Sequence, residues 1–215
     1  MAVLSVNPTR MELNELKIKL NTARRGHKLL KDKRDELMRQ FLDLVRENEK
    51  LRLKVEKAIQ EAIQHMAVAR SMTDKQVLDV ALLLPKQELS LKVTTKNVMS
   101  VPVPQYEVAY KTQNFGDIYS YGYAFTSEDM DDAILSLSEI LPDLVRLAQV
   151  EKSCQLMSSE IEKTRRRVNA LEYVMIPDYE DTIKYITMKL DENERSTSTR
   201  LMKVKDMMLE NTHQY

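Results

Sequence analysis

The side chains best suited to metal binding or nucleophilic chemistry are few and widely spaced in this chain. Three histidines and one cysteine occur among 215 residues. His27 and His65 lie far apart, and neither has a Cys, His or carboxylate at ligand spacing on its own helical face. Cys154 falls at an apolar position of a helical repeat, where a buried small side chain is the ordinary role. We therefore expect no metal site. The single cysteine, which cannot form an internal disulfide, favours a reducing compartment.

No pattern for phosphate binding or acid–base catalysis stands out either. The three glycines are scattered, and no GxxxxGK loop occurs. The carboxylates are interleaved with lysine and arginine, as on the exposed face of a helix. The sequence therefore predicts no catalytic residue and no bound cofactor.

The strongest local cluster of charge is the run Arg165, Arg166 and Arg167. Three consecutive residues span most of a helix's circumference, so at least one arginine must point away from a packed face. The cluster is either an ordinary solvated face or a docking site for an acidic partner, and both interpretations stay open. The whole chain has 33 basic and 33 acidic side chains, and this balance argues against a nucleic-acid partner.

Aromatic residues alternate with small ones after the turn-forming run 113–117. A period of two is typical of a strand, and it would place four rings on one face. Because an exposed patch of that kind invites aggregation, we expect the rings to pack on the helices or to contact a partner protein. The four residues are Tyr119, Tyr121, Tyr123 and Phe125.

Long helices must position these groups, because an apolar repeat runs from Leu13 to His65. Steps of three and four residues, averaging about 3.5, keep one face toward a partner helix in a left-handed coiled coil. Twelve of the sixteen positions are apolar, and the remaining residues are mostly charged. The positions are 13, 16, 20, 23, 27, 30, 34, 37, 41, 44, 48, 51, 55, 58, 62 and 65.

A second repeat begins at Leu147, shifts by one residue between Met175 and Ile176, and continues to Met207. Pro177 sits at the shift, and a proline inside a helix removes a backbone hydrogen bond and bends the chain. We expect a second long arm that is not straight. Pro142 should separate this arm from a short preceding helix.

Two arms joined through a compact middle must run antiparallel, which brings both termini to the same end. Residues 24–39 carry seven basic and three acidic side chains, and residues 178–194 carry two basic and six acidic ones. We expect these two stretches to lie side by side. Each ion pair would be worth only a few tenths of a kcal/mol, but together they would oppose register slips.

The middle of the chain has a different pattern. Residues 89–94 alternate apolar and polar side chains, and two prolines at 102 and 104 restrict the next segment to an edge strand or extended loop. Residues 73–76 have the form of a capping box, which predicts a short helix that ends before Pro85. The longest apolar run, Val80 to Leu84, is far shorter than the roughly 20 residues that span a bilayer.

The predicted fold class is mainly α: a long antiparallel left-handed two-helix coiled coil formed by the N- and C-terminal arms. A small β-hairpin and short helices occupy the middle. The expected regions are an N-terminal coiled-coil arm (1–72), a middle region (73–142) and a C-terminal coiled-coil arm (143–215).

Four stretches of the two arms resemble the D subunit of the V-type and archaeal A-type rotary ATPases. They are NPTRMELNELK (7–17), RRGHKLLKDKRDEL (24–37), EIEKTRRRVNALEY (160–173) and ENERSTSTRLMKVK (192–205). The resemblance is specific in residue identity and in the order of the four stretches, and it covers roughly three-quarters of the chain, whereas the segment 86–126 matches weakly.

The resemblance implies a central rotor shaft that couples ATP hydrolysis or synthesis to ion transport. Such a shaft has no catalytic role of its own. Its implied partners are the small F subunit, the catalytic A and nucleotide-binding B subunits, and the subunit that caps the membrane ring. The implied location is cytoplasmic and peripheral to the membrane, in the soluble sector of the complex, with no direct membrane insertion.

Two other classes of function stay open on the residues alone. A prefoldin-like chaperone also joins two coiled-coil arms through β-hairpins, although its subunits are shorter and its hairpins build a shared barrel. A coiled coil that binds nucleic acid could use residues 24–39 and 165–167, against the zero net charge. Binding of unfolded proteins or of polynucleotide would discriminate these alternatives from the shaft.

Overall fold

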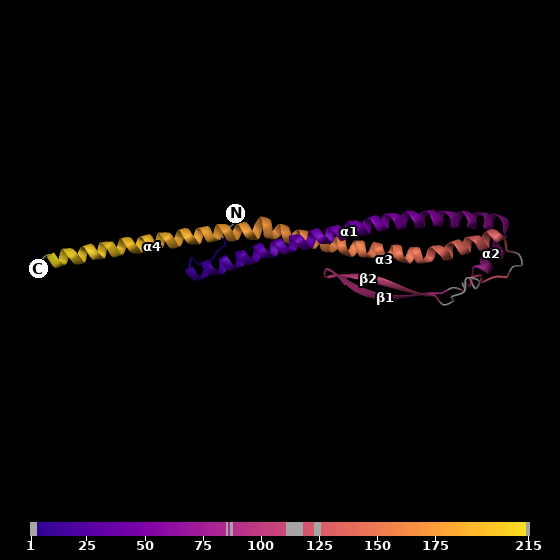
Figure 1. Ribbon diagram of the computed structural model, residues 1–215, viewed down its shortest axis with the longest axis horizontal. Helices are drawn as coiled ribbons and strands as arrows, with labels where there is room; N and C mark the ends of the chain where they lie inside the picture. The colour runs from indigo at the N-terminus through magenta and orange to yellow at the C-terminus, as the bar shows by residue number, and fades with distance from the viewer. Residues whose placement is uncertain (1–3, 85, 87, 111–117, 123–125, 214–215) are drawn as a thin grey trace. The chain divides into compact units, whose positions relative to one another are not determined.

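The structure is a computed structural model, and it describes residues 4–84, 86, 88–110, 118–122 and 126–213, with side chains up to residue 209. The chain is mainly helical, with a long helix at each end and a small antiparallel hairpin between them, as predicted (Figure 1). The elements are α1 (Arg10–Met72), α2 (Lys75–Ala81), β1 (Leu89–Val98), β2 (Val101–Tyr110), α3 (Glu128–Ala170), the π-helix η2 (Leu171–Met175) and α4 (Ile176–His213).

The chain divides into two compact units. The terminal unit comprises Met1–Asp35 and Glu162–Tyr215, and the middle unit comprises Glu36–Ile161. Helices α1 and α3 contribute residues to both units.

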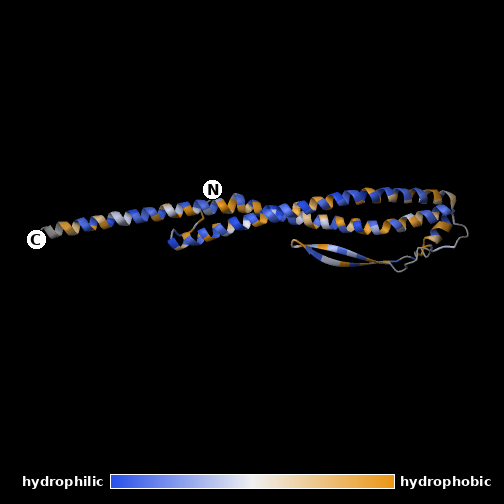
Figure 2. Cartoon of the chain, in the orientation of Figure 1, coloured by the Kyte–Doolittle hydropathy of each residue, from blue (hydrophilic) through white to orange (hydrophobic). Residues whose placement is uncertain are grey.

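Helix α1 begins at Arg10, directly after Asn7, Pro8 and Thr9. The Oγ1 atom of Thr9 accepts a hydrogen bond of 3.2 Å from the backbone N–H of Glu12, which makes Thr9 the N-cap residue. All sixteen positions of the predicted apolar repeat are buried or half-buried, and Figure 2 shows apolar and polar residues alternating along the helix. The repeat therefore identified the packed face of α1 correctly.

Pro142 does not separate a short helix from the second arm, and that prediction is wrong. Helix α3 continues through it for 43 residues. A proline costs one backbone hydrogen bond and bends a helix, but packing on either side can hold the helical conformation. Ile140 supplies such packing, because it is buried against Val55 and Ala62 of α1.

The predicted one-residue shift of the second repeat corresponds to the π-helix η2. The backbone N–H of Ile176 bonds to the carbonyl of Leu171, five residues back, so this turn holds one residue more than an α-helical turn. Pro177 follows at once, and its ring would clash with the carbonyl of Tyr173 in an α-helix. The wider turn relieves that clash and absorbs the extra residue.

Burial along α4 follows the shifted repeat. Ile183 is half-buried and Ile186 is fully buried, whereas Met175 and Tyr185, which an unshifted repeat would place on the packed face, are exposed. Thr182 is covered by the N-terminal segment, whose Leu4 N–H donates a hydrogen bond of 3.1 Å to Thr182 Oγ1. The π-helix thus keeps one face of the second arm turned toward α1 on both sides of the shift.

Ion pairs in the terminal unit establish the antiparallel direction and a register that differs from the predicted one. Arg10 pairs with Glu194, and Arg24 pairs with Glu180 at 2.6 Å. The acidic stretch therefore lies beside residues 10–24, and it meets the basic stretch 24–39 only at Arg24. Exposed ion pairs are too weak to choose the register against the burial of apolar residues, each worth about 1.5–3 kcal/mol.

The packed face of α4 ends near Leu190, because α1 begins opposite Glu194. The repeat was predicted to continue to Met207. Its remaining positions are exposed because no residue of α1 lies opposite them, and they are Asn193, Thr197, Arg200, Val204 and Met207.

Three small apolar clusters hold the middle unit together. Near the hairpin turn, Leu37 of α1 packs with Val101 of β2 and with Met157 and Ile161 of α3. The second cluster is the one around Ile140, and the third joins α1, α2 and α3. From the first cluster to the third, the residue numbers increase along α1 and decrease along α3, so these two segments are also antiparallel.

The hairpin joins β1 to β2 through Met99 and Ser100, not through the run 113–117, which lies outside the described residues. Both turn residues have positive φ angles, 50° and 72°, a conformation that glycine and asparagine favour. The side chain of Met99 packs against the cluster of Leu37, so local strain is offset by burial. Pro102 and Pro104 lie in β2 of this two-stranded sheet, as the edge-strand prediction required.

Insertion of an alanine after Val174 tests the role of the π-helix. Val174 is exposed, but a second extra residue at this point would turn α4 by about 100° relative to residues 162–170. Ile183 and Ile186 would then leave the packed face, so we expect the free energy of unfolding to fall by about 3 kcal/mol in urea titrations.

The matched control for this insertion is Pro177→Ala, which should retain the π-helix and lose less than about 1 kcal/mol, since the apolar repeat still demands the shift. An insertion variant as stable as the wild type would contradict the argument.

Candidate interaction surfaces

The described residues contain no group of three or more His, Cys, Asp or Glu side chains placed to hold a metal ion. His27 is half-buried, and its Nε2 atom lies 3.3 Å from Oε2 of Glu172 in the terminal unit. A half-buried histidine paired with a carboxylate across two helices is a structural contact. In the described part of the chain, no helix is both long enough and apolar enough to cross a membrane.

Cys154 is buried on α3, as its position in the repeat predicted. Burial raises the pKa of its thiol above the ordinary value, and the charges of Glu151 and Glu47 add to the shift. A thiol that is buried and protonated is a poor nucleophile and a poor metal ligand.

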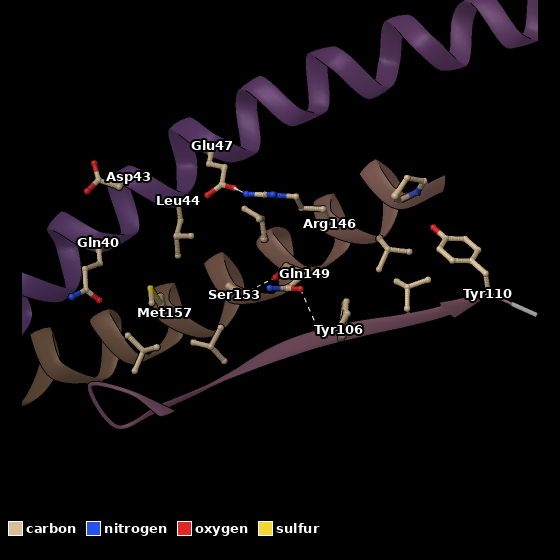
Figure 3. Close-up of a pocket in the computed structure, with 16 residues that line it drawn as sticks. Gln40, Asp43, Leu44, Glu47, Tyr106, Tyr110, Arg146, Gln149, Ser153 and Met157 are labelled. Carbon is tan, nitrogen blue, oxygen red and sulfur yellow. Dashed lines mark hydrogen bonds and ion pairs between the residues drawn. The ribbon is translucent and has the colours of Figure 1, made fainter. Parts of the chain in front are cut away.

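The middle unit contains a groove of about 830 Å³ between α1, α3 and the hairpin (Figure 3). Leu44, Val108 and Val145 are among its apolar lining residues. Glu47 and Arg146 form an ion pair of 2.8 Å across it, from α1 to α3.

Gln149 ties the hairpin to α3 in this groove. Its Oε1 atom accepts a hydrogen bond of 3.1 Å from the backbone N–H of Tyr106, as Figure 3 shows. Sequence reasoning missed Gln149, because its role depends on the strand register. The only signal was the pair of prolines, which indicated that one edge of β2 would not donate hydrogen bonds.

Arg165, Arg166 and Arg167 lie in the last turns of α3, and all three are exposed. The neighbouring Thr164 and Val168 are buried, so packing fixes the segment and turns the arginines toward solvent. Arg166 pairs with Glu162 on the same helix, and the other two form no ion pair with a described residue. Lys28 and Lys31, also exposed in the terminal unit, add to the basic character of this region.

The aromatic segment does not form the predicted strand where it is described. Residues 118–122 are irregular, and Tyr123 and Phe125 lie outside the described residues. The strand fails there because Ser120 and Tyr121 satisfy their polar groups on the helices. Ser120 Oγ donates to the carbonyl of Ala81 at 2.9 Å, and the Tyr121 hydroxyl donates to Asp131.

The rings of Tyr119 and Tyr121 meet edge to face, with centroids 6.0 Å apart. Tyr121 also packs against the cluster of Ala69, Ala81 and Met130. This part of the aromatic segment therefore fastens the chain onto the helices.

Two exposed apolar regions were not singled out from the sequence. One follows α1 and includes Met72, Val80, Leu83 and Leu84. The other lies on α4 beyond Glu194 and includes Leu201, Met202, Val204 and Met207. The sequence shows the first region as its longest apolar run, Val80 to Leu84, but it placed Val204 and Met207 of the second region on the packed face of the repeat.

These features define a class: a mainly helical protein with a small β-hairpin and with exposed apolar and basic surfaces. Comparison with known proteins shows the family. The family described as the D subunit of ATP synthase matches residues 12–206. A V-type ATP synthase D subunit of Acetivibrio thermocellus is 60% identical over 215 residues, covering 100% of this chain and 97% of that protein.

Proteins of the same name from Clostridioides difficile and Fusobacterium nucleatum are 57% and 54% identical, and each covers 97% of this chain. The matches cover 94% and 98% of those two proteins. The chain belongs to the family of ATP synthase D subunits.

The raised pKa of Cys154 predicts a pH dependence. A thiol whose pKa is higher in the folded state contributes stability that is fully present below the unfolded-state pKa, about 9, and is lost as the pH rises through the folded-state value. We expect the midpoint of urea unfolding to fall more steeply above pH 9 in the wild type than in Cys154→Ala. Parallel curves for the two proteins would show that the thiol does not contribute.

Proposed function

We propose that this chain is the central stalk, or rotor shaft, of a V-type or A-type rotary ATPase. It couples ATP hydrolysis or synthesis in the A/B hexamer to rotation of the membrane ring. The chain itself performs no bond chemistry and works at the cytoplasmic side, peripheral to the membrane. Membership of the D-subunit family supports this function, and the matches reported above give no support to the prefoldin-like alternative.

The observation that carries the proposal is the end of α4 beyond Glu194. The helix continues from Glu194, which pairs with the first residue of α1, to His213, and Leu201, Met202 and Val204 of this end are exposed. An exposed apolar helix end is typical of a segment that enters a partner. We assign this end to the interior of the hexamer of catalytic A and nucleotide-binding B subunits.

Coupling then follows from asymmetry. A single helix end with one apolar side presents different surfaces to the three catalytic interfaces that surround it. Each interface contacts a different part of the shaft and is biased toward a different conformation, because a contact shifts populations only by its differential affinity. Hydrolysis in the partners and the angle of the shaft are thereby linked.

Other surfaces suit the remaining partners. Arg165, Arg166 and Arg167 fit an acidic surface of a neighbouring subunit, and we keep them as partner contacts. The aromatic segment with Tyr119, Tyr121, Tyr123 and Phe125 lies in the middle unit, where we place the F subunit. The exposed Leu83 and Leu84 beyond α2 fit the subunit that caps the membrane ring.

The direct test is to purify the complex from membranes with an affinity tag on this chain and to identify what co-elutes. The A, B and F subunits are expected in fixed proportion. Recovery of the chain with unfolded proteins or with polynucleotide would favour one of the alternative classes.

Truncation tests the assignment of the α4 end. Removal of residues 200–215 should leave a complex that assembles and binds nucleotide, with turnover reduced about tenfold because the catalytic subunits are poorly biased. Removal of 213–215 alone is the matched control and should leave turnover unchanged. Full turnover after the longer truncation would place this end of α4 outside the hexamer.

Replacement of Arg165, Arg166 and Arg167 by Ala should act at a different step. We expect the affinity of one partner to fall about tenfold at low salt, since three screened contacts together are worth near 1.4 kcal/mol. The control is the same replacement at three basic residues that are exposed on α1: Arg46, Lys50 and Lys57. Equal losses of affinity in both triple variants would mean that the total charge of the chain, and not the arginine cluster, determines how tightly the partner binds.

A further inference from the structure

The two outer edges of the hairpin differ in what they can bind. Strand β2 lies between α3 and β1 in the middle unit, so β1 is the outer strand (Figure 1). Antiparallel pairing aligns Val98 with Val101 and Leu89 with Tyr110. In such a ladder, alternate residues point their N–H groups between the strands and away from them.

The edge of β2 is closed. Pro102 and Pro104 have no N–H, and the N–H of Tyr106 bonds to Gln149. The even-numbered residues of this strand therefore point outward, and two of them cannot donate while the third is already paired. A further strand cannot add along this part of β2.

The edge of β1 is open. Asn97, Thr95 and Val93 of β1 lie opposite Pro102, Pro104 and Tyr106 of β2. Because the two residues of such a pair point their backbone N–H groups in opposite directions, away from the hairpin, the N–H groups of Asn97, Thr95 and Val93 also point outward. By the same alternation Leu91 points outward. No described hydrogen bond uses these four N–H groups, and ten residues run without a proline or a glycine. Leu91 and Val93 are 44% and 57% exposed.

We propose that β1 is a docking site for an extended strand of another subunit of the same rotary ATPase. The proposal rests on the proposed function for the identity of the complex. A row of outward N–H and carbonyl groups is satisfied by a second extended backbone, whereas a helix has already used its own backbone groups. Addition of a third strand would also stabilise a hairpin that is marginal with two.

The side chains define the chemistry of the incoming strand. Its apolar residues would lie beside Leu91 and Val93. The charged residues of β1 are Lys92 and Lys96, and only Lys92 has a carboxylate across the hairpin, Glu107 at 3.7 Å. An acidic residue beside Lys96 would complete the pairing. A second copy of this chain fits less well, because its β1 would bring two more lysines and no acid.

Residue-resolved hydrogen exchange, on the free full-length chain and on the purified complex, tests the proposal. The amides of Leu91, Val93, Thr95 and Asn97 should exchange rapidly in the free chain and at least about tenfold more slowly in the complex. The inward amides of Lys92, Thr94 and Lys96 should be protected in both, so the change should alternate along the strand.

A proline variant adds a test by mutation. Val93→Pro removes one outward donor and costs no bond to β2, as the two prolines of β2 illustrate at equivalent outward positions. Val93→Ser is the matched control, since it removes the apolar side chain and keeps the donor. We expect wild-type stability for both free chains. Binding to the remaining subunits should be at least about tenfold weaker for the proline variant than for the serine variant.

Each outcome bears on a separate claim. A chain that co-purifies with the complex while its outward amides stay unprotected would overturn the strand-docking proposal and leave the proposed function intact. A chain that does not enter the complex would overturn the proposed function. Protection of the outward amides in the free chain that grows with concentration would identify a second copy as the occupant and would also overturn the proposal.

Discussion

Burial of one apolar face of α1 is the interaction on which the rest of the structure depends. Its repeat runs through both compact units, and residues from α3, α4, the hairpin and the N-terminal segment complete the packed surfaces around it. Leu16, Leu37 and Val55 are almost fully buried, and each side chain of this kind contributes about 1.5–3 kcal/mol. The exposed ion pairs beside this face contribute a few tenths each, so they follow the register that the apolar side chains choose.

A long packed face imposes a second constraint, because the phase of each helix must be kept along its length. The second arm contains one residue too many for an uninterrupted repeat, and η2 accommodates it where Pro177 already disfavours an α-helical turn. The same wider turn leaves Tyr173, Val174 and Met175 exposed. The irregular turn is thus a consequence of keeping both halves of the arm on α1.

The sequence allowed prediction of the elements whose cause is local. The packed face of α1, the shift at Pro177 and the alternation of β1 all appear as periods in the residue types. Other predictions failed where contacts between distant residues decide the outcome. Pro142 stays helical because Ile140 packs on α1, the charged stretches are offset because apolar burial sets the register, and residues 118–122 are irregular because Tyr121 bonds to Asp131. The groove with Gln149 could not be foreseen, since it requires the hairpin register.

The described cysteine and His27, which are among the side chains best suited to chemistry, have structural roles in this chain. Its one cysteine is buried with a raised pKa, and His27 pairs with Glu172 between two helices. Four exposed surfaces are apolar or basic: the end of α4, the residues beyond α2, the arginines of α3 and the outer strand of the hairpin. A protein that transmits force between partners needs stiffness inside and differentiated surfaces outside. The division between packed repeats and exposed apolar residues supplies both, because the residues outside the repeats are free to specify partners without disturbing the packed faces.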